Sequence, residues 1–180
     1  TDAKPQLAAA VTAAHHGLRV IVAEKAPVLG GTTAWSGGWF WAPGNSVCAR
    51  AGTKDNSEAA ETYLRAVLGN HFDPRRVAAF LTHAPRMVAF FETHTALTFE
   101  PGSHIPDTYG HLPGAGTGGR SVIAAPFDGR SLGPLIQLLR KPLRETSFWG
   151  LTIQAGADLS AFMTMTRQPR AFLHVSRRMT

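Results

Sequence analysis

The sequence predicts an α/β fold, and two adjacent segments give the first indication of it. Residues 6–16 are rich in alanine and place Leu7 and Val11 at helical spacing, which is typical of a helix packed closely on a sheet. After a short turn, residues 18–23 form a nearly continuous run of apolar, mostly β-branched side chains, as in a strand buried on both faces of a parallel sheet. A helix followed by such a strand is the second half of a βαβ unit.

The first half of that unit is not recognisable. Counted back from Leu7, the six positions of a G-x-G-x-x-G turn fall on residues 1–6, "TDAKPQ", and none of them is glycine. Each glycine of such a turn has a physical task, either in the bend, in close approach to a phosphate, or in helix–strand packing. We therefore expect a fragment: a partial Rossmann-like (βαβ) domain that lacks its first strand and its G-x-G-x-x-G turn. "GAGTGG" at 114–119 has the spacing but precedes a strand-like run, which predicts an ordinary loop.

Further helices and short strands are predicted along the rest of the chain. Helical periodicity and capping signals predict helices over residues 57–68, 74–94 and 132–144, and mostly helical structure over 158–178. Residues 96–130 are rich in loop formers, and the clearest strand there covers residues 121–125.

Composition excludes several classes of protein. The 180 residues are 44% hydrophobic and 17% charged, which allows a globular core, and no apolar run approaches the ~20 residues of a membrane span. The single cysteine, Cys48, cannot form an internal disulfide and suits a reducing compartment, so we expect a cytoplasmic location. The eight histidines lack metal-binding spacing such as H-E-x-x-H, so no metal site is predicted.

The net charge of +6 is concentrated in the last third of the chain. Neither a zinc finger, an RRM-type aromatic motif nor a run of consecutive basic residues accompanies it, so we expect no nucleic-acid partner. We interpret these side chains as solvated helix faces, or as arginines that pair with acidic partners further along a longer chain. They are Arg140, Lys141, Arg144, Arg167, Arg170, Arg177 and Arg178.

The residues that follow the predicted strand indicate a cofactor site. Glu24 ends the strand, where a carboxylate can bind the ribose hydroxyls of a dinucleotide or be an ordinary acidic residue. Glycine pairs beyond it allow close approach of a cofactor, and hydroxyls can bind pyrophosphate oxygens or flavin ring atoms. Four interleaved aromatic residues favour a large flat buried group over a flexible loop. The expected contacts are Gly30, Gly31, Thr32, Thr33, Ser36, Gly37 and Gly38.

Three stretches resemble one family. "AAHHGLRVIVAEKAPVLGGTTAWSGGWFWAPGN", "TYLRAVLGN" and "GGRSVIAAPFDGRSLG" are similar to FAD-dependent oxidoreductases that include the fumarate reductase flavoprotein subunit and, most closely, the 3-ketosteroid Δ1-dehydrogenases. The resemblance implies FAD as cofactor, with Glu24 on the adenosine ribose. It places residues 30–33 along the pyrophosphate and residues 36–38 near the isoalloxazine ring. Lys25 belongs to the same E-K-(x)4-G-G-T-(T/S)-A-x-S-G-G pattern.

The implied activity is dehydrogenation or reduction of a C–C bond next to a carbonyl in a small apolar or steroid-like ketone. Ketosteroid dehydrogenases carry a tyrosine directly after Pro-Asp in this region, whereas here Thr108 holds that position and Tyr109 follows. Tyr109 is therefore our catalytic candidate, and a packing or surface tyrosine is the alternative. We assign residues 1–95 to a partial FAD-binding domain and 96–180 to part of the FAD-binding and inserted α+β substrate-domain region.

Two rival interpretations remain at this point. The chain could be a non-catalytic truncated remnant that does not bind FAD on its own, or a basic interaction module. In each of these cases, the flavoenzyme fragment included, we expect the isolated chain to be inactive as an enzyme.

Overall fold

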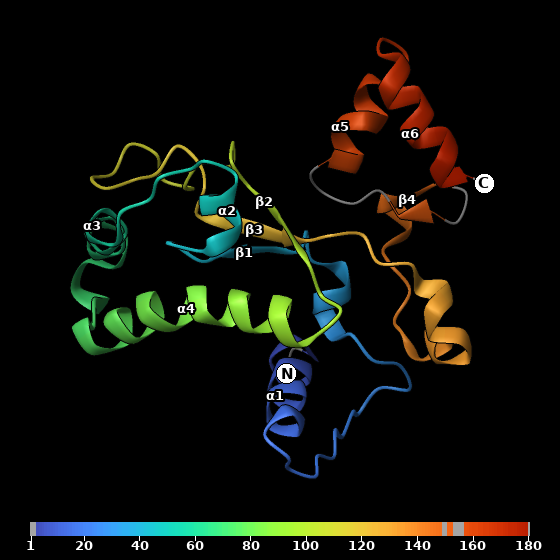
Figure 1. The fold of residues 1–180 in the computed structure, drawn as a ribbon, viewed down its shortest axis with the longest axis horizontal. Helices are drawn as coiled ribbons and strands as arrows, with labels where there is room; N and C mark the ends of the chain where they lie inside the picture. The colour runs from blue at the N-terminus through green and yellow to red at the C-terminus, as the bar shows by residue number, and fades with distance from the viewer. Residues whose placement is uncertain (1–2, 149–150, 153–156, 180) are drawn as a thin grey trace. The chain divides into compact units, whose positions relative to one another are not determined.

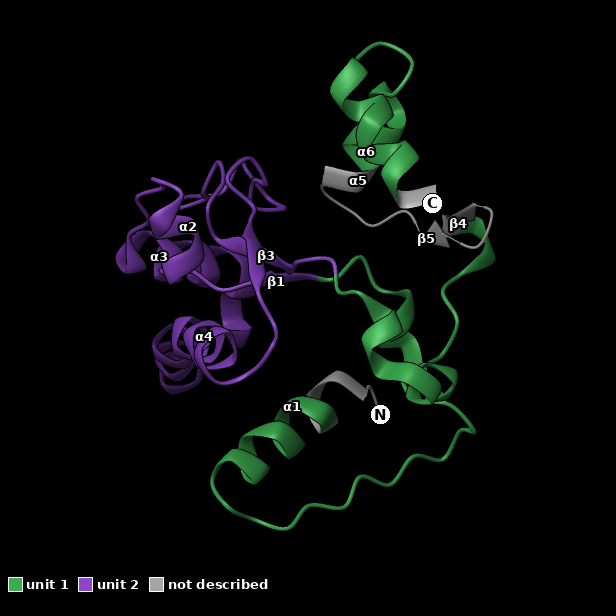
Figure 2. Cartoon of the chain, turned by 45° about the vertical axis from the view of Figure 1, so that its right-hand side comes forward, with its two compact units in different colours: residues 1–38, 127–180 green, residues 39–126 purple. Residues whose placement is uncertain are grey.

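The computed structural model describes residues 3–148, 151–152 and 157–179, and the chain divides into two compact units (Figures 1 and 2). Unit 1 consists of residues 1–38 and 127–180, and unit 2 consists of residues 39–126. The boundaries between the units, after residues 38 and 126, differ from the domain boundary predicted after residue 95. That domain boundary stays a prediction.

The helices of unit 2 begin at polar capping residues. They are α2 (Ser46–Arg50), α3 (Ser57–Leu68), the short 3-10 helix η2 (Gly69–His71) and α4 (Pro74–His94). The side chains of Asn45, Asn56 and Asp73 each accept a hydrogen bond from a backbone N–H of the first turn that follows. The helices predicted over residues 57–68 and 74–94 are confirmed.

A three-stranded antiparallel sheet packs with these helices, and Figure 1 shows α4 running alongside it. Its strands are β1 (Trp39–Trp41), β2 (Phe99–Pro101) and β3 (Ser121–Ala124), in the order β1-β3-β2. The strand predicted over residues 121–125 is confirmed as β3. The buried apolar side chains of this unit are Ala42, Val47, Cys48, Ala60, Tyr63, Val77, Ala84, Val88, Phe91, Phe99, Val122 and Ile123.

Unit 1 contains α1 (Ala3–His15), the 3-10 helices η1 (Gly31–Trp35), η3 (Gly129–Leu138) and η4 (Arg144–Thr146), the strand pair β4 (Ser147–Phe148) and β5 (Leu151–Thr152), and the helices α5 (Ala157–Thr164) and α6 (Pro169–Met179). The first predicted helix is confirmed by α1, and the helical stretch predicted over 158–178 by α5 and α6. These last two helices pack against each other, with Ala171 and Val175 buried.

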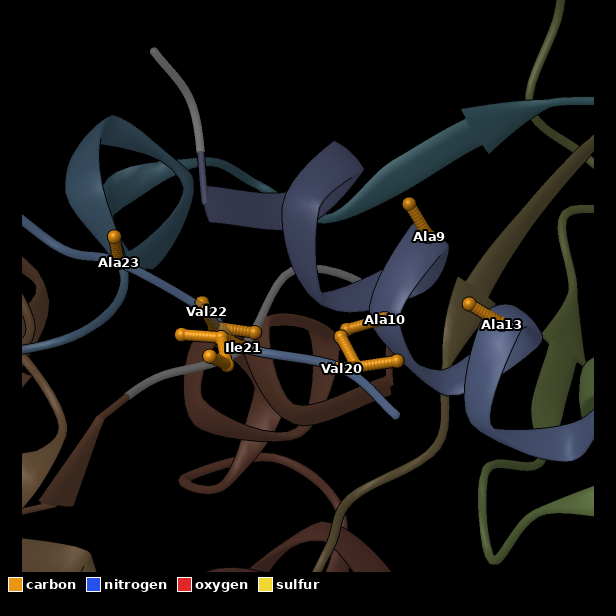
Figure 3. A pocket seen from close by; sticks show the side chains of 7 residues that line it. All are labelled: Ala9, Ala10, Ala13, Val20, Ile21, Val22 and Ala23. Atoms are coloured by element: carbon orange, nitrogen blue, oxygen red, sulfur yellow. The ribbon is translucent and has the colours of Figure 1, made fainter. Parts of the chain in front are cut away.

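The strand predicted over residues 18–23 is wrong for this structure. These residues form neither helix nor strand, and the backbone of residues 19–23 has no hydrogen-bond partner within the described part of the chain. A strand needs a neighbouring backbone to pair with, and without one the side chain of Ile21 is 93% exposed. Figure 3 shows the segment beside the alanines of α1, where the two line an open apolar hollow.

The prediction of an α-helix over residues 132–144 is also wrong. The structure forms η3 instead, with Gly133 at a φ of 52° and Pro134 inside it, and residues 139–143 continue without helical structure. Pro142 contributes, because the residue before a proline is disfavoured in the α conformation. The described helices and small antiparallel sheets are consistent with part of an α/β fold.

Candidate cofactor-binding site

The glycine turn, residues 29–38, has a backbone that only glycines adopt readily. Gly30, Gly31 and Gly38 have φ values of +125°, +50° and +82°. The N–H of Ala34 donates to the carbonyl of Gly30 at 3.1 Å, which closes the first bend into η1. The paired glycines are therefore required by the chain's own conformation.

A second segment, residues 138–141, holds this turn, and we call it the basic segment. The N–H of Leu29 donates to the carbonyl of Leu138 at 2.6 Å, and the N–H of Arg140 donates to the carbonyl of Leu29 at 2.7 Å. These bonds form an isolated parallel bridge. At the other end, Nε1 of Trp35 donates to the carbonyl of Lys141 at 3.2 Å. The glycine turn is thus attached to the basic segment near both of its ends.

The side chain of Arg140 lies against the glycine turn. Its guanidinium carbon is 5.0 Å from the ring centroid of Trp35, within cation–π distance. A Cβ added at Gly30 would lie 3.3 Å from the Cβ of Arg140. The Nε atom of Arg140 is buried and has no hydrogen-bond partner among the described residues.

The interpretation of Arg140 as part of a solvated helix face is therefore wrong. The residue belongs to an irregular segment paired with the glycine turn, and Pro142 was the local signal that a helix could not continue there. The pairing itself joins residues more than a hundred positions apart, so no local pattern indicates it.

The other predicted cofactor residues of unit 1 lie in or just before the same turn. The carboxylate of Glu24 accepts a hydrogen bond from the N–H of Ala26 at 2.9 Å, which bends the chain toward the turn. Lys25 is exposed. The hydroxyl of Ser36 accepts from the N–H of Gly38 at 3.2 Å. Thr32 and Thr33 lie within η1. Their roles toward a cofactor stay predictions.

The chemistry of this turn fits a dinucleotide such as FAD. A Cβ added at Gly37 would meet nothing within 4 Å, so the chain itself leaves room there. Trp35 is 45% exposed and offers an aromatic surface. The unpaired Nε of Arg140 is a cationic donor suited to an anionic oxygen. Gly30 has a different reason to be glycine, because a Cβ there would lie 3.0 Å from that of Ala34.

Tyr109 belongs to unit 2, in the turn that follows Asp107. Its N–H donates to the hydroxyl of Tyr63 on α3 at 3.2 Å, and its own side chain is 49% exposed. The ring stands edge-on to that of His111, with centroids 6.4 Å apart. The phenol is thus presented to solvent on a backbone that α3 holds, and its catalytic role stays a prediction.

A buried ionic network holds the chain just before Tyr109. The carboxylate of Asp107 accepts hydrogen bonds from Nη1 of Arg120 at 2.6 Å, from Nε1 of Trp41 at 2.7 Å and from the N–H of Gly116 at 2.7 Å. Nε of Arg120 also donates to Asp55 at 2.9 Å. The sequence does not predict a role for Arg120 or Asp55, since nothing local marks them as partners.

The loop at 114–119 leads into the strand β3, as the strand-like run after it predicts. Two of its glycines pack against backbone. A Cβ at Gly114 would collide with the carbonyl of Ala59 on α3, and one at Gly118 would collide with the carbonyl of Ser103.

Comparison with known proteins identifies the family to which these features belong. A sequence profile of the FAD binding domain family matches residues 7–170, which is nearly the whole chain. The chain belongs to this family. FAD is accordingly the cofactor that the comparison supports, and the resemblance to flavin-dependent oxidoreductases is confirmed.

Similar proteins of this family include dehydrogenases of cyclic ketones. The chain is 38% identical to a 4-oxocyclohex-2-ene-1-carboxylate 5-dehydrogenase of Sinomonas cyclohexanicum, over 96% of the chain and 29% of the relative. It is 45% identical to a 3-oxosteroid 1-dehydrogenase of Mycobacterium tuberculosis, over 71% of the chain and 23% of the relative.

A solved structure shares the fold. It is the 3-ketosteroid Δ1-dehydrogenase of Sterolibacterium denitrificans in complex with 1,4-androstadiene-3,17-dione, with a TM-score of 0.83 and 35% identity over 96% of this chain and 30% of that one. The chain thus spans less than a third of the length of these relatives. Within the described residues, no helix is long and apolar enough to cross a lipid bilayer.

Proposed function

We propose that this chain is the part of an FAD-dependent dehydrogenase that carries one wall of the cofactor site and a candidate substrate-contacting tyrosine. The observation that supports this best is the glycine turn with its paired basic segment. The turn carries the exposed Trp35 and the open space at Gly37, and Arg140 of the basic segment has a buried Nε without a partner among the described residues. Buried donors in proteins normally have an acceptor, since an unpaired one costs stability, so this Nε is a position where a ligand could supply the acceptor.

In this proposal, one group of residues binds the cofactor and Tyr109 contacts the substrate. Bound FAD supplies the hydride acceptor. Residues 30–33 and 36–38 hold the cofactor by backbone N–H groups and hydroxyls, and Glu24 accepts hydrogen bonds from its ribose. The phenol of Tyr109 donates a hydrogen bond to the ketone oxygen, which polarises the carbonyl and makes the C–H bond next to it more acidic.

The substrate class we propose is a cyclic ketone. The relatives act, by their names, on 3-oxosteroids and on an oxocyclohexene carboxylate, and all of these hold a ketone on a six-membered ring. We propose dehydrogenation of the C–C bond next to that ketone as the activity of the whole protein. The buried Cys48 is a free thiol, which suits our proposal of a cytoplasmic location.

One observation favours the rival proposal of a remnant that does not bind FAD. Residues 19–23 have no backbone partner among the described residues, and Ile21 is 93% exposed. Unpaired apolar backbone of this kind promotes association between chains. The two proposals differ in whether the purified chain binds flavin.

A flavin titration separates them. Purified chain is titrated with FAD and, as a control, with NAD⁺, and binding is followed by flavin fluorescence and by sedimentation of the chain. Saturation at one FAD per chain with a monomeric chain is the expected result. A chain that leaves FAD free and sediments as aggregates would contradict the proposal and support the remnant. Addition of a 3-ketosteroid to the FAD-loaded chain should then perturb the flavin spectrum, less so in Tyr109→Phe.

A further inference from the structure

We infer that Arg140 is a binding residue for the pyrophosphate of the dinucleotide cofactor, with its Nε–H as the donor. This inference rests on the proposed function, which supplies the cofactor, and it adds a residue that neither the motif nor its spacing indicates. Three independent features of unit 1 support it: the position of the side chain, its missing partner and its local charge.

The position of Arg140 is set by backbone pairing with the glycine turn. The hydrogen bonds from Leu29 to Leu138 and from Arg140 to Leu29 fix the start of the basic segment against residue 29. The stem of the side chain then passes Gly30, and its guanidinium reaches the ring of Trp35 at the end of η1. The side chain therefore starts beside Gly30 and ends beside Trp35, two residues that bracket the stretch on which the pyrophosphate is expected.

The missing partner of Arg140 indicates a ligand. Most buried polar atoms in proteins have a hydrogen-bond partner, because an unpaired one loses its hydration without compensation. The Nε of Arg140 is a buried side-chain donor that lacks one among the described residues. The contact with the Trp35 ring, at 5.0 Å from the guanidinium carbon, acts through the charge of the guanidinium and supplies no hydrogen-bond acceptor to Nε.

The charge of Arg140 is not neutralised locally. No carboxylate of the described residues forms an ion pair with it, whereas Arg130 of the same unit pairs with Asp128 at 2.7 Å. An uncompensated guanidinium with a free planar donor is the group that binds phosphate oxygens best in proteins. Riboflavin lacks the pyrophosphate of FAD, so the inference predicts that Arg140 contributes to the binding of FAD and not to that of riboflavin.

The test compares ligands that do or do not carry the pyrophosphate. Dissociation constants for FAD and for riboflavin are measured by flavin fluorescence in the unaltered chain, in Arg140→Met, in Arg140→Lys and in Arg144→Met. Arg144 is exposed and has the same charge, so its variant controls for net charge. We expect Arg140→Met to weaken FAD binding about tenfold or more, as for loss of a hydrogen bond to a charged group, and to leave riboflavin unchanged.

Two variants separate directional donation from charge. Arg140→Lys keeps the charge but has no donor at Nε, and we expect it to recover only part of the lost affinity. Arg144→Met should stay within twofold of the unaltered chain. Equal losses of FAD affinity in Arg140→Met and Arg144→Met would overturn the inference, and so would an unchanged affinity in Arg140→Met.

A second readout does not depend on flavin. The ¹⁵N–¹H signal of Arg140 Nε, assigned by its absence in Arg140→Lys, should shift on addition of inorganic pyrophosphate and not of riboflavin. A shift with pyrophosphate in a chain that binds no FAD would support the anion site and contradict the proposed function. FAD binding without any change at Arg140 would leave the proposed function standing and overturn this inference. A chain indifferent to both ligands would overturn both.

Discussion

Arg120 of unit 2 and Arg140 of unit 1 are both arginines with buried nitrogens, but their surroundings differ. Arg120 is 3% exposed, and its guanidinium donates to Asp55, Asp107 and the carbonyl of Gly114 at 2.6–2.9 Å. Arg140 contacts a tryptophan ring, and its buried Nε has no partner among the described residues. The first arginine completes a network inside the protein, whereas the second leaves a donor for a ligand.

Two glycines, Gly114 of unit 2 and Gly37 of unit 1, also differ in their surroundings. In unit 2, Gly114 has a φ of +76° and lies against the backbone of α3, so the protein itself fills the space beside it. In unit 1, Gly37 has no atom within 4 Å of the place where a Cβ would stand. The closed packing at Gly114 is structural, whereas the space at Gly37 leaves room for the proposed cofactor.

The largest effect is expected for Arg120→Met. This change leaves the carboxylates of Asp55 and Asp107 buried without their cation, and breaking a buried pair from one side costs roughly 3–5 kcal/mol. The measurement is urea unfolding of the purified chain, followed by circular dichroism. Should the variant not fold, Asp55→Asn, which removes one of the two ion pairs, should still show a loss.

The matched control is Arg140→Met. Because it removes an unpaired buried donor, we expect its free energy of unfolding to change by less than about 1 kcal/mol, the size of the lost cation–π contact. A loss as large as that of Arg120→Met would mean that Arg140 is a structural residue, and the contrast between the two arginines would fail.

A smaller effect is expected when the two glycines are replaced by alanine. Gly114→Ala introduces a Cβ against the carbonyl of Ala59 at a positive φ, and such overpacking costs about 1–3 kcal/mol. Gly37→Ala should be neutral, or stabilising by up to about 1 kcal/mol through the unfolded state. Thermal unfolding of both variants gives the comparison, and FAD titration of Gly37→Ala shows whether the open space serves the cofactor. Equal destabilisation by both would contradict the distinction between closed and open packing.

The smallest effect concerns the exposed pair of Asp128 and Arg130. Hydrogen bonds from the Arg130 side chain, its backbone N–H and its charge hold the pKa of the Asp128 carboxyl below its ordinary value of 3.8. The folded state then favours the ionised form, so the contribution to stability is present above pH 3.8 and is lost as the pH falls through the lowered pKa. NMR titration of the carboxyl should show a higher midpoint in Arg130→Gln. An identical midpoint in both proteins would show that the pair is not formed in solution.

Several elements could be predicted from the sequence, because their signals are local. Asn56 and Asp73 cap the helices that follow them, and the apolar periodicity of residues 74–94 sets the buried face of α4. The glycine and hydroxyl pattern of residues 30–38 is likewise local, and it was sufficient to indicate the family and FAD.

Other features depended on contacts that no local pattern contains. The run at 18–23 has the composition of a strand, yet a strand also requires a neighbouring backbone, and none of the described residues supplies one. The basic segment has the composition of a helix face, but Gly133, Pro134 and Pro142 interrupt helical structure around it.

The sequence by itself determined the helices of unit 2, the conformation of the glycine turn and the family, since each depends on side chains within a few positions of one another. Only the tertiary structure decided which arginine is paired and which is not. Both side chains are guanidinium groups, and the difference between them comes from their surroundings. The Arg120–Asp55 pair joins residues 65 positions apart. The Trp35–Lys141 hydrogen bond, which helps to hold the basic segment against the glycine turn, joins residues 106 positions apart. Chain folding, rather than local composition, places a carboxylate beside one guanidinium and leaves the buried Nε of the other without a partner among the described residues.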